Sequence, residues 1–133
     1  MDTTPQKKTI LIVEDQPLNV QHLNEMLGDE FDIRYATSGE KAIAMIHQMM
    51  PDLILLDILM PGLDGRHVLQ YIRDHERKMK VAAQDRVKIV MTSAMGFPQG
   101  NVKALHSQCD AYITKPVTKE KLAEVLNTLG FHI

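Results

Sequence analysis

The sequence has one cysteine, no long apolar run and no excess of positive charge, and each scarcity excludes a class of protein. Cys109 is the only cysteine, so no intrachain disulfide can form, which suits a reducing compartment. No run approaches the roughly 18 apolar residues of a membrane span, and no apolar stretch of signal-peptide length follows the N-terminal lysines. The formal net charge of −2 argues against bulk attraction to nucleic acid. We therefore expect a cytoplasmic protein that binds neither membranes nor nucleic acid.

The length of the chain bounds its organisation. Its 133 residues correspond to about one ordinary domain, and 44% hydrophobic with 24% charged residues is typical of a globular fold. There is no internal repeat. We expect a single domain over residues 1–133, with a core from 8 to 129 and no attached output domain. Cys109 is interpreted as a small buried apolar side chain.

Short apolar runs alternate with segments of helical periodicity. The runs predict five strands, at residues 9–13, 32–36, 53–57, 88–92 and 111–114. Two of them, ILIV and LILL, are continuously apolar, as expected of parallel strands covered by helices on both faces. The polar stretch 74–86 is interpreted as solvent-exposed surface.

Apolar residues at helical spacing predict five helices between and after the strands. The stripes are Val20, Leu23, Met26 and Leu27; Ala42, Ile43, Ile46, Met49 and Met50; Val68, Leu69 and Ile72; Val102 and Leu105; and Leu122, Val125, Leu126 and Leu129. Gly130 is well placed to end the last one. Five strand-then-helix units imply right-handed crossovers and a flavodoxin-like α/β fold, a doubly wound parallel sheet with strand order 2-1-3-4-5.

Ligands of such sheets bind beyond the carboxyl ends of the strands, so the residues at the strand exits are the candidates for chemistry. These are Glu14 and Asp15 after the first strand, Asp57 at the end of the third, Thr92 and Ser93 at the fourth, and Lys115 after the fifth. Three carboxylates, a hydroxyl and an ammonium group would meet at one edge.

Each of these residues alone has an ordinary structural explanation. Asp15 could cap the helix that Pro17 opens, Ser93 could be a turn residue, and Lys115 could be solvated. Together they are harder to explain, because two carboxylates about 5 Å apart repel by roughly 3 kcal/mol at an effective dielectric near 20. A cation would relieve this repulsion. Oxygen ligands with few protein groups favour Mg²⁺, with Mn²⁺ possible, over zinc.

Four sequence blocks at the strand exits, ILIVED, LILLDILMPGLDG, MTSA and AYITKP, resemble the successive signatures of response-regulator receiver domains. The similarity covers residues 8 to 129. The resemblance implies that Asp57 is the phosphoacceptor. It also implies that Glu14, Asp15, Asp57 and the backbone carbonyl of Leu59 hold Mg²⁺.

The resemblance assigns three further roles. Ser93 would be the switch hydroxyl, Lys115 the phosphoryl contact, and Tyr112 the aromatic whose rotamer reports the state. Ser93 is preferred to Thr92 because the family's hydroxyl precedes a small residue, here Ala94. Thr92 is then expected on the other face of the sheet.

The sequence also predicts the backbone conformation of two loops. Pro61-Gly62 suits a type II turn, and Asp64 can cap a helix that starts at Gly65. The family pattern has a cis bond between Lys115 and Pro116, whereas only about 5–6% of X-Pro bonds in folded proteins are cis.

By this resemblance the chain is a phosphoacceptor switch and not an enzyme, although it would assist its own phosphorylation and dephosphorylation. Its partners would be a histidine kinase or histidine phosphotransfer protein and an unknown downstream protein. The signalling surface would comprise the fourth helix, fifth strand and fifth helix. The stretch EDQPLNV, with Asn19, is similar to receivers of hybrid kinases and phosphorelays.

Three alternatives are weighed against this reading. An aspartyl-phosphate phosphatase carries a second Asp two residues after the nucleophile, where this chain has Leu59. A flavin- or nucleotide-binding module needs a Gly/Ser/Thr loop after the first strand, where EDQP would repel phosphate. A degenerate scaffold receiver would lack part of the acidic, Ser93 and Lys115 set. The six histidines form no ligand pair on one helical turn and are interpreted as ordinary surface or boundary residues.

One residue departs from the family pattern, and two others bear on how fast the aspartyl phosphate is hydrolysed. Gln108 stands where the family commonly has Gly before the fifth strand. Leu59 and Met95 are apolar where fast-hydrolysing relatives carry polar side chains that orient water. We therefore expect an aspartyl phosphate that lives for about minutes or longer.

Overall fold

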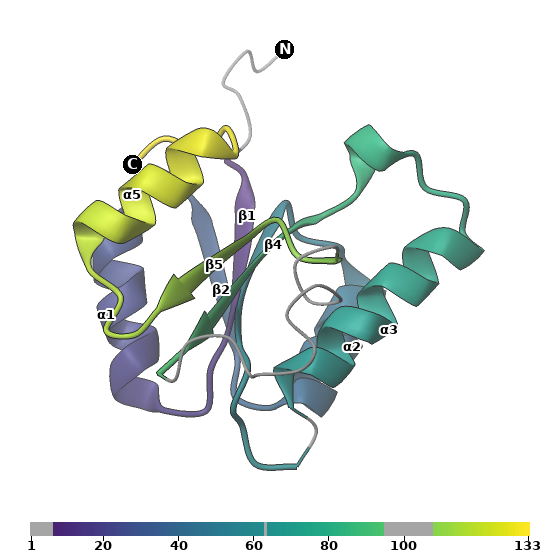
Figure 1. Ribbon diagram of the computed structural model, residues 1–133, viewed down its shortest axis with the longest axis horizontal. Helices are drawn as coiled ribbons and strands as arrows, with labels where there is room; N and C mark the ends of the chain where they lie inside the picture. The colour runs from purple at the N-terminus through teal and green to yellow at the C-terminus, as the bar shows by residue number, and fades with distance from the viewer. Residues whose placement is uncertain (1–6, 63, 95–107) are drawn as a thin grey trace.

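The chain folds as a five-stranded parallel sheet with helices on both faces, as the computed structural model shows for residues 7–62, 64–94 and 108–133 (Figure 1). The strands are β1 (Thr9–Val13), β2 (Asp32–Ala36), β3 (Leu53–Asp57), β4 (Lys88–Ser93) and β5 (Ala111–Thr114). Their order across the sheet is β2-β1-β3-β4-β5, and every neighbouring pair is parallel. The predicted strands and strand order are confirmed, with β4 one residue longer than expected.

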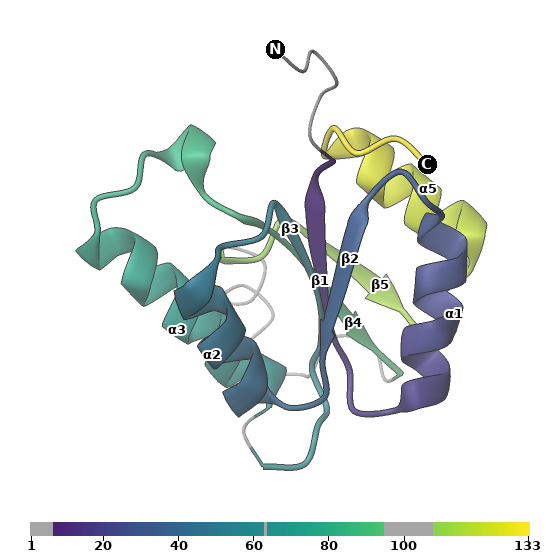
Figure 2. The ribbon, with the colours of Figure 1, turned by 180° about the vertical axis from the view of Figure 1, so that it is seen from behind.

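Four α-helices lie in the described residues. They are α1 (Pro17–Leu27), α2 (Gly39–Gln48), α3 (Gly65–Lys78) and α5 (Lys119–Thr128), and a 3-10 turn, η1, spans Ala83–Asp85. Figures 1 and 2 show α1 and α5 on one face of the sheet and α2 with α3 on the other. The predicted fourth helix, with Val102 and Leu105, lies outside the described residues. Within those residues, no helix has the length and apolar character needed to cross a membrane.

The core consists of two apolar clusters, one on each face of the sheet. Alternating residues of a strand point to opposite faces, so Ile10 and Ile12 of β1 pack in the cluster beneath α1 and α5. Leu11 and Val13 pack in the cluster beneath α2 and α3. The central strand β3 is buried along its whole length. This confirms that its continuous apolar run is covered on both faces.

Most helix ends have local causes in the sequence. Pro17 opens α1, while the side chains of Ser38, Asp64 and Thr118 accept backbone hydrogen bonds at the starts of α2, α3 and α5. Gly28 and Gly130 follow α1 and α5 with positive φ angles of 77° and 92°. The alternative in which Asp15 caps α1 is wrong, because the N-cap is Gln16 and no side chain caps this helix.

Two sequence-based expectations about burial need correction. Met49 and Met50 were expected in the apolar stripe of the second helix, but α2 ends at Gln48 and both methionines are exposed. Met45 packs against the core instead. The stretch 74–86 is not uniformly exposed, because its first part belongs to α3 and Glu76 is only 2% exposed.

Gly65 lets the start of α3 approach the end of β3. Its N–H donates to the backbone oxygen of Ile58 at 2.9 Å. A Cβ atom at this position would lie 2.2 Å from the backbone oxygen of Asp57, which is shorter than any tolerable contact. The absence of a side chain at residue 65 therefore permits this close approach of α3 to the end of β3.

Candidate functional site

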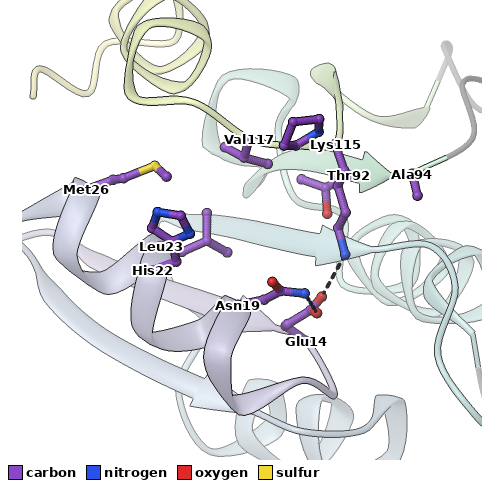
Figure 3. Close-up of a pocket in the computed structure, with 10 residues that line it drawn as sticks. Glu14, Asn19, His22, Leu23, Met26, Thr92, Ala94, Lys115 and Val117 are labelled. Atoms are coloured by element: carbon purple, nitrogen blue, oxygen red, sulfur yellow. Dashed lines mark hydrogen bonds and ion pairs between the residues drawn. The ribbon is translucent and has the colours of Figure 1, made fainter.

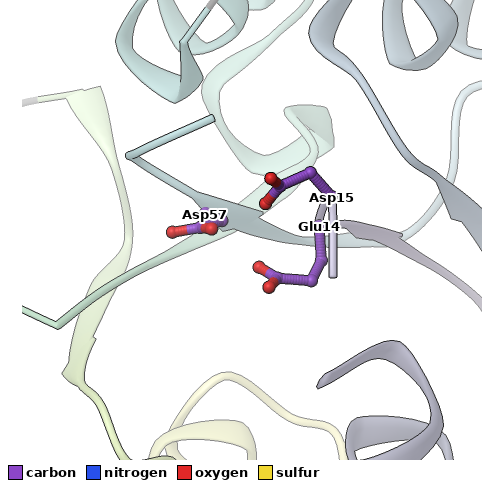
Figure 4. A group of neighbouring side chains, drawn as sticks. All are labelled: Glu14, Asp15 and Asp57. Atoms are coloured by element: carbon purple, nitrogen blue, oxygen red, sulfur yellow. The ribbon is translucent and has the colours of Figure 1, made fainter. Parts of the chain in front are cut away.

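Three carboxylates meet where β1 and β3 end. Glu14 and Asp15 follow β1, Asp57 ends β3, and one oxygen from each lies within 4.8 Å of the others (Figure 4). Glu14 and Asp57 are 2% and 4% exposed, whereas Asp15 is half-buried. The parallel register that pairs Val13 with Leu56 brings these two strand ends together. The sequence-based prediction of an acidic cluster at this edge is therefore confirmed in its geometry.

Hydrogen-bond donors approach this cluster from three elements. Lys115, just after β5, places its Nζ 3.3 Å from Glu14 Oε2 and 3.2 Å from Asp57 Oδ2. Asn19 of α1 donates its amide to the other oxygen of Glu14, at 2.7 Å. The backbone N–H of Leu59 donates to Asp57 Oδ1 at 3.3 Å. One ammonium group thus bridges two of the three carboxylates, and the charge of the cluster remains negative.

Burial among like charges changes the proton affinity of the central carboxylate. Desolvation raises the pKa of Asp57 to about 7, and a hydrogen bond and charge repulsion from Glu14 act in the same direction, while Lys115 opposes them. For Lys115, burial alone would lower the pKa, but the charges of Asp57 and Glu14 raise it overall. The Lys115 ammonium is therefore firmly protonated, whereas the surroundings of Asp57 disfavour the negative charge on its carboxylate.

The hydroxyl and aromatic residues predicted for the site lie at its β4 and β5 side. Ser93 ends β4, is 2% exposed, and its backbone oxygen accepts the N–H of Lys115 at 2.7 Å. Thr92 lies on the opposite face, since it lines the pocket beside α1. Tyr112 of β5 is half-buried and packs against the apolar cluster beneath α2 and α3. Met95, predicted to flank a water path, lies outside the described residues.

A pocket of about 380 Å³ opens beside the acidic cluster, between α1 and the turn into α5 (Figure 3). Glu14 and Lys115 form its polar end, whereas Leu23, Met26 and Val117 make an apolar wall. Lys115 follows β5 and is joined to Pro116 by the cis peptide bond that the resemblance implied. The pocket gives solvent access to the cationic side of the cluster.

The donor set suits a hard divalent cation. Three carboxylates with their oxygens this close, two of them buried, leave negative charge that Lys115 does not balance. Oxygen-only ligands in small number favour Mg²⁺, which keeps several waters. Leu59, whose carbonyl was predicted as a further ligand, lies two residues beyond β3 with its side chain 53% exposed. The residues present therefore fit a Mg²⁺ site.

Sequence reasoning missed a second polar network, on the far side of α3. Arg73 is 7% exposed and donates to Glu76 Oε1 at 2.7 Å and to Asp110 Oδ2 at 3.0 Å. It also donates to the backbone oxygens of Gln108, at 2.7 Å, and Val87, at 2.9 Å. One guanidinium therefore ties α3 to the lead-in of β4 and to the residues before β5. No pattern in the sequence marks Arg73 as buried.

Comparison with proteins of known sequence gives a single family. The model for the response regulator receiver domain matches residues 10–127. The chain is 30% identical over 121 residues to the chemotaxis protein CheY of Halobacterium salinarum, which covers 90% of this chain and 94% of that protein. It is 35% identical to the hybrid signal transduction histidine kinase L of Dictyostelium discoideum, covering 91% of this chain. It is 33% identical to the DNA-binding response regulator MtrA of Mycolicibacterium smegmatis, covering 92% of this chain.

Solved structures agree with this assignment. A putative response regulator from Chloroflexus aurantiacus superposes with a TM-score of 0.77 at 28% identity, covering 94% of this chain and 99% of that one. Vibrio cholerae chemotaxis protein CheY4 has the same fold, with a TM-score of 0.77 at 21% identity over 92% of this chain and 98% of that one.

Several relatives are much longer than this chain. It spans 7% of the Dictyostelium kinase and 49% of MtrA. What the relatives share with it is the receiver unit, which in this family is a phosphoacceptor switch of two-component signalling. The matched residues include every strand end described above, and the chain therefore belongs to the response regulator receiver domain family.

Proposed function

We propose that Asp57 accepts a phosphoryl group from a phosphohistidine in a Mg²⁺-dependent reaction and that this changes the surface containing β5 and α5. One observation carries the proposal. Asp57 is the buried carboxylate on which the cluster converges, with Lys115 Nζ 3.2 Å from one of its oxygens and Glu14 and Asp15 beside it. Charges of both signs surround the place where a phosphoryl group would arrive.

The chemistry follows from this placement. An Asp57 oxygen attacks phosphorus and forms an acyl phosphate, while the bond from phosphorus to the donor nitrogen breaks and its electrons return to the imidazole. Glu14, Asp15, Asp57 and the carbonyl of Leu59 would hold Mg²⁺, which would supply charge neutralisation and alignment. Lys115 neutralises a further phosphoryl oxygen. The chain acts as a switch that assists its own phosphorylation and dephosphorylation, not as an enzyme with a separate substrate.

Signalling would begin at Ser93. A phosphoryl group on Asp57 attracts the Ser93 hydroxyl and moves the segment after β4, which leaves room for Tyr112 to turn inward. Such a change is a population shift, so it requires the phosphoryl group to interact better with the active arrangement. Ser93→Ala and Lys115→Ala should retain some phosphorylation but weaken the change around Tyr112. NMR shifts identical to wild type in both variants would contradict these roles.

The partner is proposed as a histidine kinase or a histidine phosphotransfer protein. Asn19, which holds Glu14 at 2.7 Å, belongs to the stretch that resembles phosphorelay receivers. Onward transfer to a phosphotransfer protein is therefore included in the proposal.

The acceptor assignment can be tested with a small acyl phosphate and intact-mass spectrometry. We expect one added phosphoryl group in the presence of Mg²⁺, and none in Asp57→Asn or after chelation. Asp52→Asn is the matched control, because Asp52 lies just before the same strand and its side chain accepts the N–H of Thr9 at 2.8 Å, away from the acidic cluster. Undiminished labelling of Asp57→Asn, or equal loss in Asp52→Asn, would refute the assignment.

A further inference from the structure

Two histidines from different helices meet on the face of the molecule that carries α2 and α3. His47 lies near the end of α2, and His75 lies in the second half of α3. Their ring centroids are 5.6 Å apart. Tyr71, one turn before His75 on α3, is stacked on it with centroids 6.2 Å apart, and its hydroxyl contacts His47 Nε2. Sequence spacing could not show this pair, because its members are 28 positions apart in the sequence.

The separation of the two rings suits a shared metal ion. Nitrogens about 2.0–2.1 Å from one tetrahedral ion hold their ring centroids about 5–6 Å apart. His47 is exposed and His75 half-buried, so an ion can reach both rings from solvent. We propose that His47 and His75 form a two-histidine site for a divalent transition-metal ion, Zn²⁺ in particular, which bridges α2 and α3.

Tyr71 organises this site. Residues one helical turn apart share a face of the helix, so Tyr71 and His75 form one edge, and the Tyr71 hydroxyl holds the His47 ring toward α3. Tyr71 is therefore a positioning residue, and because its hydroxyl contacts Nε2 of His47, the ligand nitrogen of that ring is Nδ1. Waters complete the coordination, because the only group of three or more carboxylate, imidazole or thiolate ligands in the described residues is the acidic cluster.

The chemistry of the ligands separates the two sites. Imidazole nitrogen favours Zn²⁺, Cu²⁺ and Ni²⁺, whereas carboxylate and water favour Mg²⁺. The histidine site also draws on α2 and α3, while the acidic cluster draws on the ends of β1 and β3. The proposal is therefore independent of the function proposed for Asp57, and either can fail without the other.

The consequence for the fold is a metal-dependent link between two neighbouring helices. An ion that binds the folded state and not the unfolded chain raises the unfolding temperature. Because His47 and His75 come from different helices, this gain requires both of them. A lone surface histidine that binds Zn²⁺ weakly would not give it.

The test is a Zn²⁺ titration of the whole chain in excess Mg²⁺, which keeps the acidic cluster occupied. Isothermal titration calorimetry gives stoichiometry and affinity, and imidazole NMR signals report which rings respond. The variants are His47→Gln and His75→Gln. His132→Gln is the matched control, because His132 is exposed in the C-terminal segment. Circular dichroism confirms that each variant is folded.

We expect one bound Zn²⁺, shifts at both His47 and His75, and affinity at least about tenfold weaker in either variant. The thermal gain should disappear in both variants and persist in His132→Gln. The proposal is overturned if wild type binds no Zn²⁺, if both variants bind as tightly as wild type, or if the two imidazoles do not shift. Zn²⁺ binding that weakens in proportion to added Mg²⁺ would place the ion at the acidic cluster and equally overturn it.

Discussion

Replacing Arg73 by Met should destabilise the fold far more than replacing any exposed arginine. The guanidinium is 7% exposed and donates to two carboxylates and two backbone oxygens. Methionine keeps much of the volume but leaves Glu76, itself 2% exposed, as a buried charge without its cation. Breaking a buried pair in this way costs about 3–5 kcal/mol. That is a large share of the roughly 5–15 kcal/mol by which domains are stable.

The assay is urea unfolding followed by circular dichroism, with the free energy extrapolated to water. Arg77→Met is the matched control, because Arg77 lies on the same helix and pairs with Asp74 at the exposed surface. Exposed pairs contribute about 0–1 kcal/mol, so this variant should be nearly neutral.

A double variant separates the charge effect from packing. Arg73→Met combined with Glu76→Leu removes both charges and should recover part of the lost stability, because an apolar pair often replaces a buried ion pair at little cost. Val87 loses its acceptor, Glu76 Oε2 at 2.8 Å, so recovery should be incomplete. A cost below about 1 kcal/mol for Arg73→Met, or equal costs in the Arg73 and Arg77 variants, would refute this reasoning.

Three further predictions concern the residues near Asp57. Gly65→Ala should cost about 1–3 kcal/mol and reduce acyl-phosphate labelling, because its Cβ would overlap the Asp57 backbone oxygen; unchanged unfolding and labelling would contradict the close approach. Asp64→Ala should cost about 1 kcal/mol at pH 7. Burial alone would raise the pKa of Asp64, but hydrogen bonds from Arg66 lower this pKa overall. The stability that Asp64 contributes is therefore present above the ordinary carboxyl pKa and is lost as the pH falls through the lowered pKa. Urea unfolding of wild type and variant should therefore converge in acid, and a constant difference would contradict this. Dephosphorylation with Mg²⁺ should take about minutes or longer and be faster in Leu59→Asn, because an amide there can orient water; decay of wild type within seconds, or no acceleration, would contradict the link.

The sequence predicted the sheet well because its three central strands, β1, β3 and β4, are buried on both faces. Continuous apolar runs such as LILL leave few alternatives to a central parallel strand. The strand order follows from the connections between the strands. Because parallel strands end at one edge, the meeting of Glu14, Asp15 and Asp57 also followed from the strand assignments alone.

The sequence-based predictions failed where the course of the chain or contacts between distant segments determine whether a side chain is buried. Met49 and Met50 continue the period of α2, but the chain leaves the helix at Gln48, just before Pro51. Glu76 looks like surface in a charged segment, because its partner Arg73 is buried only when β4 and β5 are in place. The contact between His47 and His75 likewise requires two helices to pack together.

Because Lys115 follows β5, its ion pairs make the charge balance of the acidic cluster depend on the folding of that strand. Lys115 reaches Glu14 across 101 positions of sequence, and it follows β5, which is the last strand of this sheet in chain order. A nascent chain that ends before β5 would hold three carboxylates without the cation that offsets their repulsion. Pairing of β5 with β4 would therefore bring in an ammonium group that offsets this repulsion, and Asp57 should be phosphorylated less efficiently in molecules where β5 has not yet paired.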